Sequence, residues 1–164
     1  GARDIGEDPD ALPHTYAKLI NDCLTGRPDD MTVCIHLCRG NFKSTHAAAG
    51  NYEPVAEALL KEMDLDAYFM EYDDARSGSF APLAHVPDDR MVVLGLVSTK
   101  HAALEDPALL LRRIDEAAAH VPVERLCLSP QCGFSSTVHG NEITADQQIA
   151  KLRHVVSIAE AVWR

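Results

Sequence analysis

Residue types that bind metal ions stand at the ends of several apolar segments of this chain. His36 and Cys38 end a run rich in β-branched residues. Glu71 ends the second apolar run, and Cys132 follows the fourth. Active sites of parallel α/β proteins assemble at the carboxyl ends of the strands, so these side chains are expected to meet there. The sequence therefore predicts one site made of His36, Cys38, Glu71 and Cys132.

Two thiolates, one imidazole and one carboxylate suit tetrahedral Zn²⁺, a borderline-soft ion without redox chemistry. Ligands scattered widely along a chain are typical of catalytic zinc, whereas structural zinc uses compact paired motifs. Three anionic ligands would give the centre a net negative charge and make it a poor generator of hydroxide from water. Such a centre would instead hold a substrate thiol as a nucleophilic thiolate. Alkyl transfer to a thiol is therefore favoured over hydrolysis.

Other side chains near these runs have simpler interpretations. Buried cysteines are usually inert small apolar residues, and that is the expectation for Cys23, Cys34 and Cys127. Arg39 and Lys100 each follow a strand, where they would hold an anionic substrate group or form a salt bridge. Solvated positions are expected for the remaining histidines and for four loop aspartates: His14, His46, His85, His101, His120, His139, His154, Asp73, Asp74, Asp88 and Asp89.

The elements that position these residues follow from hydrophobic periodicity. Short apolar runs predict strands over 31–38, 67–71, 91–97 and 126–128, and 3.6-residue periodicity predicts helices between and around them. Asp106 and Thr144 are expected helix N-caps. The helices are expected over 13–24, 52–63, 107–117 and 145–163. Residues 1–12 are expected to form an extended arm, and 72–90 mostly a loop.

Strands that are apolar throughout are typical of a parallel sheet in an α/β protein. A closed (β/α)8 barrel needs roughly 250 residues, and four strand units make half of one. The alternative is a flat, doubly wound sheet. A half-barrel would leave two unpaired edges and an open inner face, so we expect a homo-oligomer or association with a missing N-terminal half.

Composition excludes several classes of partner. The chain has 164 residues and a formal net charge of -10, which disfavours nucleic acids and anionic membranes. No apolar run approaches the roughly 20 residues of a membrane span, and no signal-peptide pattern is seen. The first residue is Gly1, as expected for a trimmed or tagged chain. The cysteine count of 5 is odd, which favours free thiols or metal ligands in a reducing cytoplasm over disulfides.

Four motifs resemble the cobalamin-independent methionine synthase family, and most closely its short, single-barrel members. They are HLCRGN (36–41), EYDDARSG (71–78), LGLVSTK (94–100) and LSPQCGFSS (128–136). The resemblance implies that residues 1–164 form the C-terminal half, strands five to eight, of a methionine synthase-like (β/α)8 barrel. It also implies a zinc ion held by His36, Cys38, Glu71 and Cys132.

The resemblance implies a zinc-dependent methyltransferase that converts homocysteine to methionine, with 5-methyltetrahydrofolate as the donor. Its partners would be a small-molecule thiol and a methyl donor. No residue is assigned acid–base catalysis or substrate binding. Three alternatives stay open: a non-catalytic half-barrel with structural zinc, a different zinc-dependent thiol alkyltransferase, and a metal-free enzyme with Cys132 as nucleophile and His36 as its partner.

Overall fold

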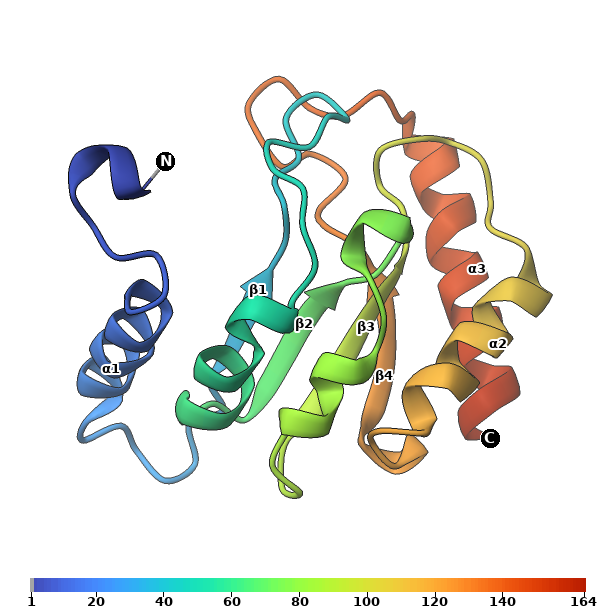
Figure 1. The fold of residues 1–164 in the computed structure, drawn as a ribbon. Helices are drawn as coiled ribbons and strands as arrows, with labels where there is room; N and C mark the ends of the chain where they lie inside the picture. Colours follow the sequence, from blue (N-terminus) through green and yellow to red (C-terminus); the bar gives the residue numbers. More distant parts are fainter. Residues whose placement is uncertain (1) are drawn as a thin grey trace.

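Four strands form one parallel sheet, which confirms the predicted α/β class. In the computed structural model, which describes residues 2–164, these strands are β1 (Cys34–Leu37), β2 (Ala67–Glu71), β3 (Met91–Val97) and β4 (Leu126–Pro130). They lie side by side in the order in which they occur along the chain. All of them point the same way in Figure 1, and the loops that follow β1, β3 and β4 gather beyond the arrowheads. The candidate ligands therefore belong to one end of the sheet.

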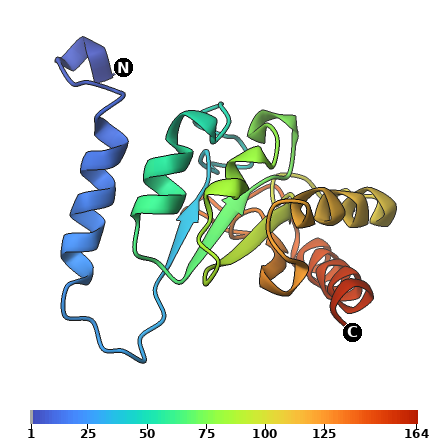
Figure 2. The same ribbon diagram turned by 60° about the horizontal axis from the view of Figure 1, so that its bottom comes forward.

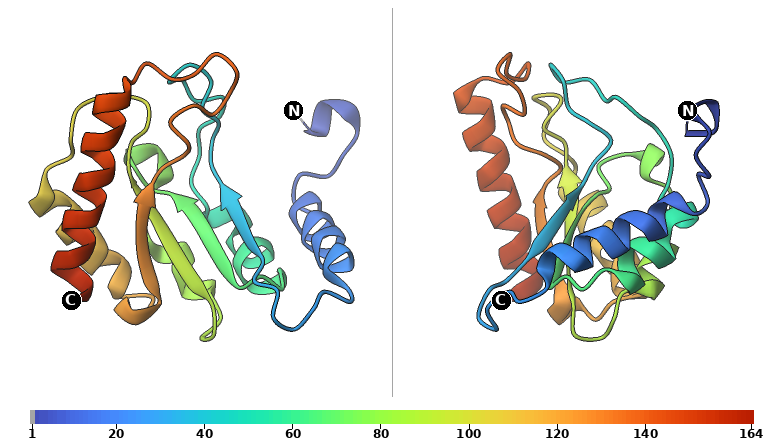
Figure 3. Two further views of the ribbon diagram at one scale, coloured as in Figure 1. Left: turned by 180° about the vertical axis from the view of Figure 1, so that it is seen from behind. Right: turned by 90° about the vertical axis from the view of Figure 1, so that its left-hand side faces the viewer.

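The helices form an arc around one side of the sheet. Figure 2 shows α1 (Leu12–Leu24), the helix η3 (Glu57–Glu62), α2 (Pro107–Ala118) and α3 (Ala145–Trp163) along this arc. Seen from behind in Figure 3, the sheet carries no helix on its other face within residues 2–164. No helix of this described part combines the length and apolar character needed to cross a bilayer.

The two C-terminal helices begin where the sequence predicts. The Asp106 carboxylate accepts a hydrogen bond of 3.0 Å from the Ala108 amide, and Pro107 occupies the first turn of α2. Thr144 and Gln147 form a capping box at the start of α3, where the Gln147 side chain accepts from the Thr144 amide at 2.8 Å. These contacts satisfy amide groups that have no partner inside a helix.

The segment 52–63, predicted as one helix, is less regular. A 3-10 turn, η2 (Glu53–Val55), precedes η3, which is a π-helix. The Tyr68 hydroxyl of β2 lies 3.2 Å from the Leu60 carbonyl and 3.0 Å from the Met63 carbonyl. A side chain of the sheet therefore satisfies carbonyl groups at the end of this helix, and regular α-helical hydrogen bonds are not required there.

Two predictions for the N-terminal part are wrong in detail. Residues 2–5, expected to be extended, form a 3-10 helix, η1 (Ala2–Ile5), while residue 1 lies outside the described residues. The strand predicted over 31–38 begins only at Cys34. The Asp66 carboxylate accepts a hydrogen bond from the Val33 amide at 2.7 Å, so a side chain and not a neighbouring strand satisfies this amide.

The segment 72–90, expected to be mostly a loop, contains two short 3-10 helices. They are η4 (Ala75–Ser77) and η5 (Ala81–His85).

A buried ion pair fixes the segment that follows β3. Nζ of Lys151, on α3, is fully buried and donates to the Ala103 carbonyl at 2.7 Å and to Oε1 of Glu105 at 3.1 Å. The same Glu105 oxygen accepts from the Ser98 amide at 2.9 Å. Because α3 and the end of β3 are connected in this way, the residues after β3 are held over the edge of the sheet.

The face without helices is partly polar. Register places His36 of β1 beside Phe69 of β2, followed by Val93 of β3 and Cys127 of β4. Cys34 and His36 are exposed on this face, and Phe69 is 36% exposed. An open face with an exposed aromatic ring agrees with the expectation of a half-barrel whose inner side is uncovered.

Candidate metal centre

His36, Cys38 and Cys132 come together at the carboxyl end of the sheet. Their ligand atoms all lie within 4.8 Å of one another, and Cys132 Sγ is 3.5 Å from His36 Nε2. Tetrahedral zinc, with bonds of about 2.3 Å to sulfur and 2.0 Å to nitrogen, would separate a sulfur from a nitrogen by roughly 3.5 Å. The spacing and the donor types of these three side chains therefore fit one zinc ion.

These three residues come from the two outer strands of the sheet. His36 lies in β1, Cys38 directly follows β1, and Cys132 follows β4. Gly95 of β3 helps to bring the ends together, because a Cβ there would lie 2.9 Å from the Met70 carbonyl oxygen and 3.1 Å from Gln131 Cα. The missing side chain lets the end of β4 approach closely, at a point where the pairing of β3 with β4 shifts register.

Glu71, the fourth predicted ligand, is in a different environment. Its carboxylate is fully buried and accepts from the Arg39 amide at 2.6 Å. Lys100 Nζ lies 3.4 Å from its Oε1, and the guanidinium nitrogen Nη2 of Arg76 lies 3.3 Å from the same oxygen. Burial alone would raise the pKa of Glu71, but the Arg39 amide and then the Lys100 charge outweigh it, and the net pKa is lowered. Glu71 is thus a buried anion held by cations, outside the group of three close ligand atoms.

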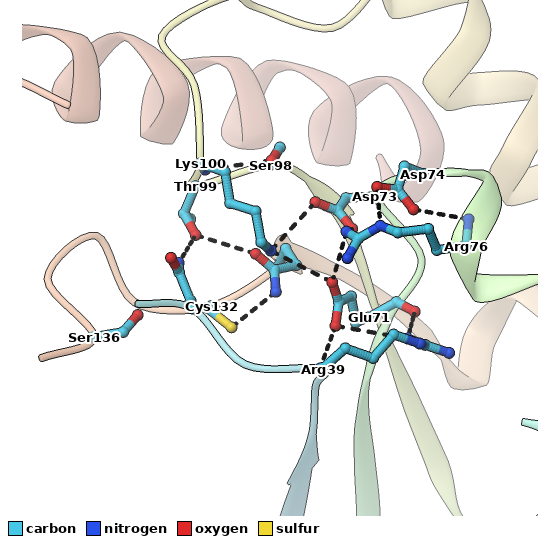
Figure 4. Close-up of polar contacts among 12 residues, drawn as sticks. Arg39, Glu71, Asp73, Asp74, Arg76, Ser98, Thr99, Lys100, Cys132 and Ser136 are labelled. Carbon is cyan, nitrogen blue, oxygen red and sulfur yellow. Dashed lines mark hydrogen bonds and ion pairs between the residues drawn. The ribbon is translucent and has the colours of Figure 1, made fainter. Parts of the chain in front are cut away.

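The cations around Glu71 also bind Asp73 (Figure 4). Asp73 lies 3.9 Å from Lys100 and 3.9 Å from Arg76, and only 2% of its side chain is exposed. The expectation of a solvated Asp73 is therefore wrong, because two cations compensate its burial. For Arg39 and Lys100, salt bridges to Glu71 are formed, as one of the two alternatives predicts.

Tyr52 ties the ends of β1 and β2 together beside this cluster. Its hydroxyl donates to the Leu37 carbonyl at 2.9 Å and accepts from the Glu71 amide at 2.9 Å. The Arg39 guanidinium stacks over the Tyr52 ring at 4.4 Å from the ring centroid. The phenol therefore positions the residues next to Cys38 and the backbone of Glu71.

The surroundings of the Cys132 thiol disfavour its thiolate form. Burial, followed by the neighbouring Cys38 thiol, raises the pKa of Cys132 to about 12. Reactive cysteines have lowered pKa values beside cations or helix N-termini. Two neighbouring thiols ionise together only when a cation compensates their charge, and a bound metal ion does so.

Three buried polar residues near Cys132 are not singled out by sequence reasoning. They are Asn41, Thr99 and Gln131, which are 7%, 0% and 2% exposed. Gln131 Nε2 donates to Cys132 Sγ at 2.9 Å. Each of them lies within a few residues of a strand end, which is also the position that points to the two cysteines. A neutral side chain at such a position does not indicate which partner it will bind.

Residues 15–161 match the family model described as the catalytic domain of cobalamin-independent synthase. The chain belongs to this family. The match extends over most of the described residues and includes all four predicted ligands. It confirms the family indicated by the four sequence motifs.

Two proteins of Bacillus subtilis (strain 168) are similar to almost the whole chain. The chain is 55% identical over 163 residues to the uncharacterized protein YxjH and 53% identical over 161 residues to the uncharacterized protein YxjG. These matches cover 99% and 98% of this chain, but 43% of each relative. The chain therefore spans less than half the length of these relatives.

Two solved structures share the fold. One is presented as a candidate vitamin-B12 independent methionine synthase from Listeria monocytogenes, with 34% identity and a TM-score of 0.71 over 97% of this chain and 43% of that one. The other, a B12-independent methionine synthase from Shewanella sp. W3-18-1 in complex with selenomethionine, has 16% identity and a TM-score of 0.72. It covers 93% of this chain and 44% of that one. The open four-stranded sheet of this chain thus corresponds to one half of the barrel in these proteins.

Proposed function

We propose that this chain supplies the zinc centre of a methyltransferase that acts on a substrate thiol. The observation that carries this proposal is the meeting of His36, Cys38 and Cys132, whose ligand atoms lie within 4.8 Å of one another. Membership of the cobalamin-independent synthase family supports the reaction class. The proposed acceptor is homocysteine, the product methionine, and the methyl donor 5-methyltetrahydrofolate. The proposed setting is a reducing cytoplasm, which the odd cysteine count of 5 favours.

Zinc bound here would lower the pKa of the acceptor thiol and keep its sulfur nucleophilic. His36, Cys38 and Cys132 would hold the ion, and Glu71 is proposed as the fourth, exchangeable ligand. A carboxylate is the hardest donor in a sulfur-rich site and therefore the one that a substrate sulfur should displace. Lys100 and Arg76 lie within 3.4 Å of Glu71 and give its carboxylate compensating charge when it is not a ligand.

In the proposed reaction, the bond between the donor nitrogen and the methyl carbon breaks as the acceptor sulfur bonds to that carbon. The leaving nitrogen takes up a proton. Both reactants must be held in line for this displacement. The chain spans 43% of its Bacillus relatives, so we propose that the remaining binding groups come from a complementary half-barrel or a second copy on the open face.

Metal analysis tests the zinc centre directly. The protein should bind close to one equivalent of zinc, while Cys38→Ser and Cys132→Ser should lose most of it because each removes a thiolate ligand. Cys23→Ser is the matched control, since Cys23 is an exposed free thiol on α1. Full zinc in either ligand variant would refute the assignment.

X-ray absorption spectroscopy distinguishes substrate activation from structural zinc. Adding homocysteine to the zinc-loaded protein should add a Zn–S contact at about 2.3 Å. An unchanged zinc environment would support the alternative of a non-catalytic half-barrel. If a different thiol adds the contact and homocysteine does not, the site belongs to another thiol alkyltransferase.

A further inference from the structure

Three buried side chains connect the segments after β1, β3 and β4 through successive hydrogen bonds. Asn41 Nδ2 donates to Thr99 Oγ1 at 3.0 Å, and Thr99 Oγ1 donates to Gln131 Oε1 at 3.3 Å. Gln131 Nε2 then donates to Cys132 Sγ at 2.9 Å. Figure 4 shows these contacts as dashed lines between Thr99 and Cys132. We call Asn41, Thr99 and Gln131 the amide relay.

The direction of the amide relay follows from its two ends. A thiolate only accepts hydrogen bonds, so Gln131 must turn its amide nitrogen toward Cys132. Its amide oxygen then needs a donor, which the Thr99 hydroxyl supplies. Asn41 donates to the same hydroxyl oxygen, which leaves the Thr99 proton available for Gln131. The opposite direction would place the Gln131 oxygen against the sulfur lone pairs.

We propose that Gln131 is a positioning residue for the metal-bound thiolate of Cys132, and that Thr99 and Asn41 fix the orientation of its amide. This inference rests on the zinc centre proposed above and assigns it a hydrogen-bonding partner. An amide that donates to a thiolate stabilises its negative charge and restricts where its sulfur can move. Residues that contact metal ligands in this way typically change metal affinity about 10- to 100-fold when they are replaced.

A purely structural role would have different consequences. Thr99 and Gln131 are buried polar side chains, and each satisfies the other whether or not a metal is bound. In that case their replacement would lower stability and leave the metal centre unchanged. The deciding measurement must therefore report on the thiolate itself.

A matched pair of substitutions at Thr99 provides the test. Thr99→Val keeps the shape and removes the hydroxyl, whereas Thr99→Ser keeps the hydroxyl. Gln131→Leu removes the amide that contacts sulfur. Gln148→Leu is the control, because the Gln148 side chain, on α3, takes no part in the three hydrogen bonds of the amide relay. The readouts are zinc affinity by chelator competition and the thiolate-to-metal charge-transfer band of the cobalt-loaded protein.

Thr99→Val and Gln131→Leu should weaken zinc binding roughly 10- to 100-fold and move the charge-transfer band to lower energy. Thr99→Ser and Gln148→Leu should retain the affinity and the band of the unaltered protein. Unchanged affinity and band in folded Thr99→Val and Gln131→Leu would overturn the proposal. If circular dichroism shows that Thr99→Val does not fold, the zinc affinity and the charge-transfer band of Gln131→Leu decide between the two roles. Zinc retained by Cys132→Ser would instead refute the centre itself.

Discussion

Arg39 contacts the buried carboxylate of Glu71 through both its backbone and its side chain. The amide of Arg39 donates to Oε2 at 2.6 Å, and its guanidinium lies 3.6 Å from the same oxygen. Since Arg39 directly follows Cys38, one peptide unit connects a proposed zinc ligand to the anion beside it. The position of Cys38 and the charge of Glu71 are therefore stabilised together.

Arg39→Met should destabilise the protein by about 2 kcal/mol, because a buried carboxylate loses one of its charged partners. The loss should fall below the roughly 3–5 kcal/mol expected when a buried ion loses its sole partner, since Lys100 and Arg76 remain. Urea unfolding measures it. Arg112→Met, on the exposed side of α2, is the control, and equal free energies of unfolding for the two variants would contradict the assigned role.

Tyr52→Phe should lower the free energy of unfolding by roughly 1–3 kcal/mol. The hydroxyl bridges the Leu37 carbonyl and the Glu71 amide, and both groups would lose this buried partner. Thermal unfolding followed by circular dichroism gives the change. Tyr16→Phe removes an equivalent hydroxyl from an exposed ring on α1 and should have little effect. A Tyr52 variant as stable as the Tyr16 variant would show that the bridge is unimportant.

Gly95→Ala should destabilise the protein by about 1–3 kcal/mol through overpacking. The new methyl group would lie 2.9 Å from the Met70 carbonyl oxygen, and backbone atoms cannot easily move away. Gly133→Ala is the stability control, because its methyl group would meet only Ser136 Oγ at 3.9 Å. Zinc affinity should also fall in Gly95→Ala, since the displaced Gln131 backbone precedes Cys132. Equal stability of the two variants would argue against a close approach at Gly95.

Removing zinc with a chelator should make the exposed Cys38 reactive toward a thiol-labelling reagent, while Cys132 stays slow because burial raises its pKa to about 12. Metal-bound thiolates are protected, and Cys23 and Cys34 serve as internal controls because they are exposed free thiols that react either way. Peptide mass spectrometry identifies the labelled positions. In an assembly that carries out the proposed methyl transfer, the reaction should stop on chelation and return with zinc. Activity that persists without metal would favour the alternative in which Cys132 is the nucleophile.

The fold was largely predictable because its signals are local. Apolar runs identify the strands, and Asp106 and Thr144 identify the starts of α2 and α3. The irregular helix after Tyr52 was not predictable, since the Tyr68 hydroxyl that satisfies its last carbonyls comes from a strand. The late start of β1 likewise depends on Asp66, which lies far along the chain.

The candidate site was predictable in its residue types but not in its charge environment. Strand-end positions select His36, Cys38 and Cys132, which the structure brings together. The contact of Lys100 with Glu71 depends on how β2 and β3 align, and the contact of Arg76 with Glu71 depends on the turn after β2, so neither partner could be assigned to Glu71 from periodicity. The ligand role of Glu71 stays a prediction, and the metal analysis and spectroscopy proposed above address it.

The outermost strands, β1 and β4, both lead into the proposed metal ligands. An ion held there would connect the carboxyl ends of the two edge strands across the full width of the sheet. Curvature of the sheet and affinity for the ion then become linked quantities, and the linkage works in both directions. Binding of the ion should slow amide hydrogen exchange in both β1 and β4. Any molecule that flattens the sheet should lower the affinity for the ion without contacting it.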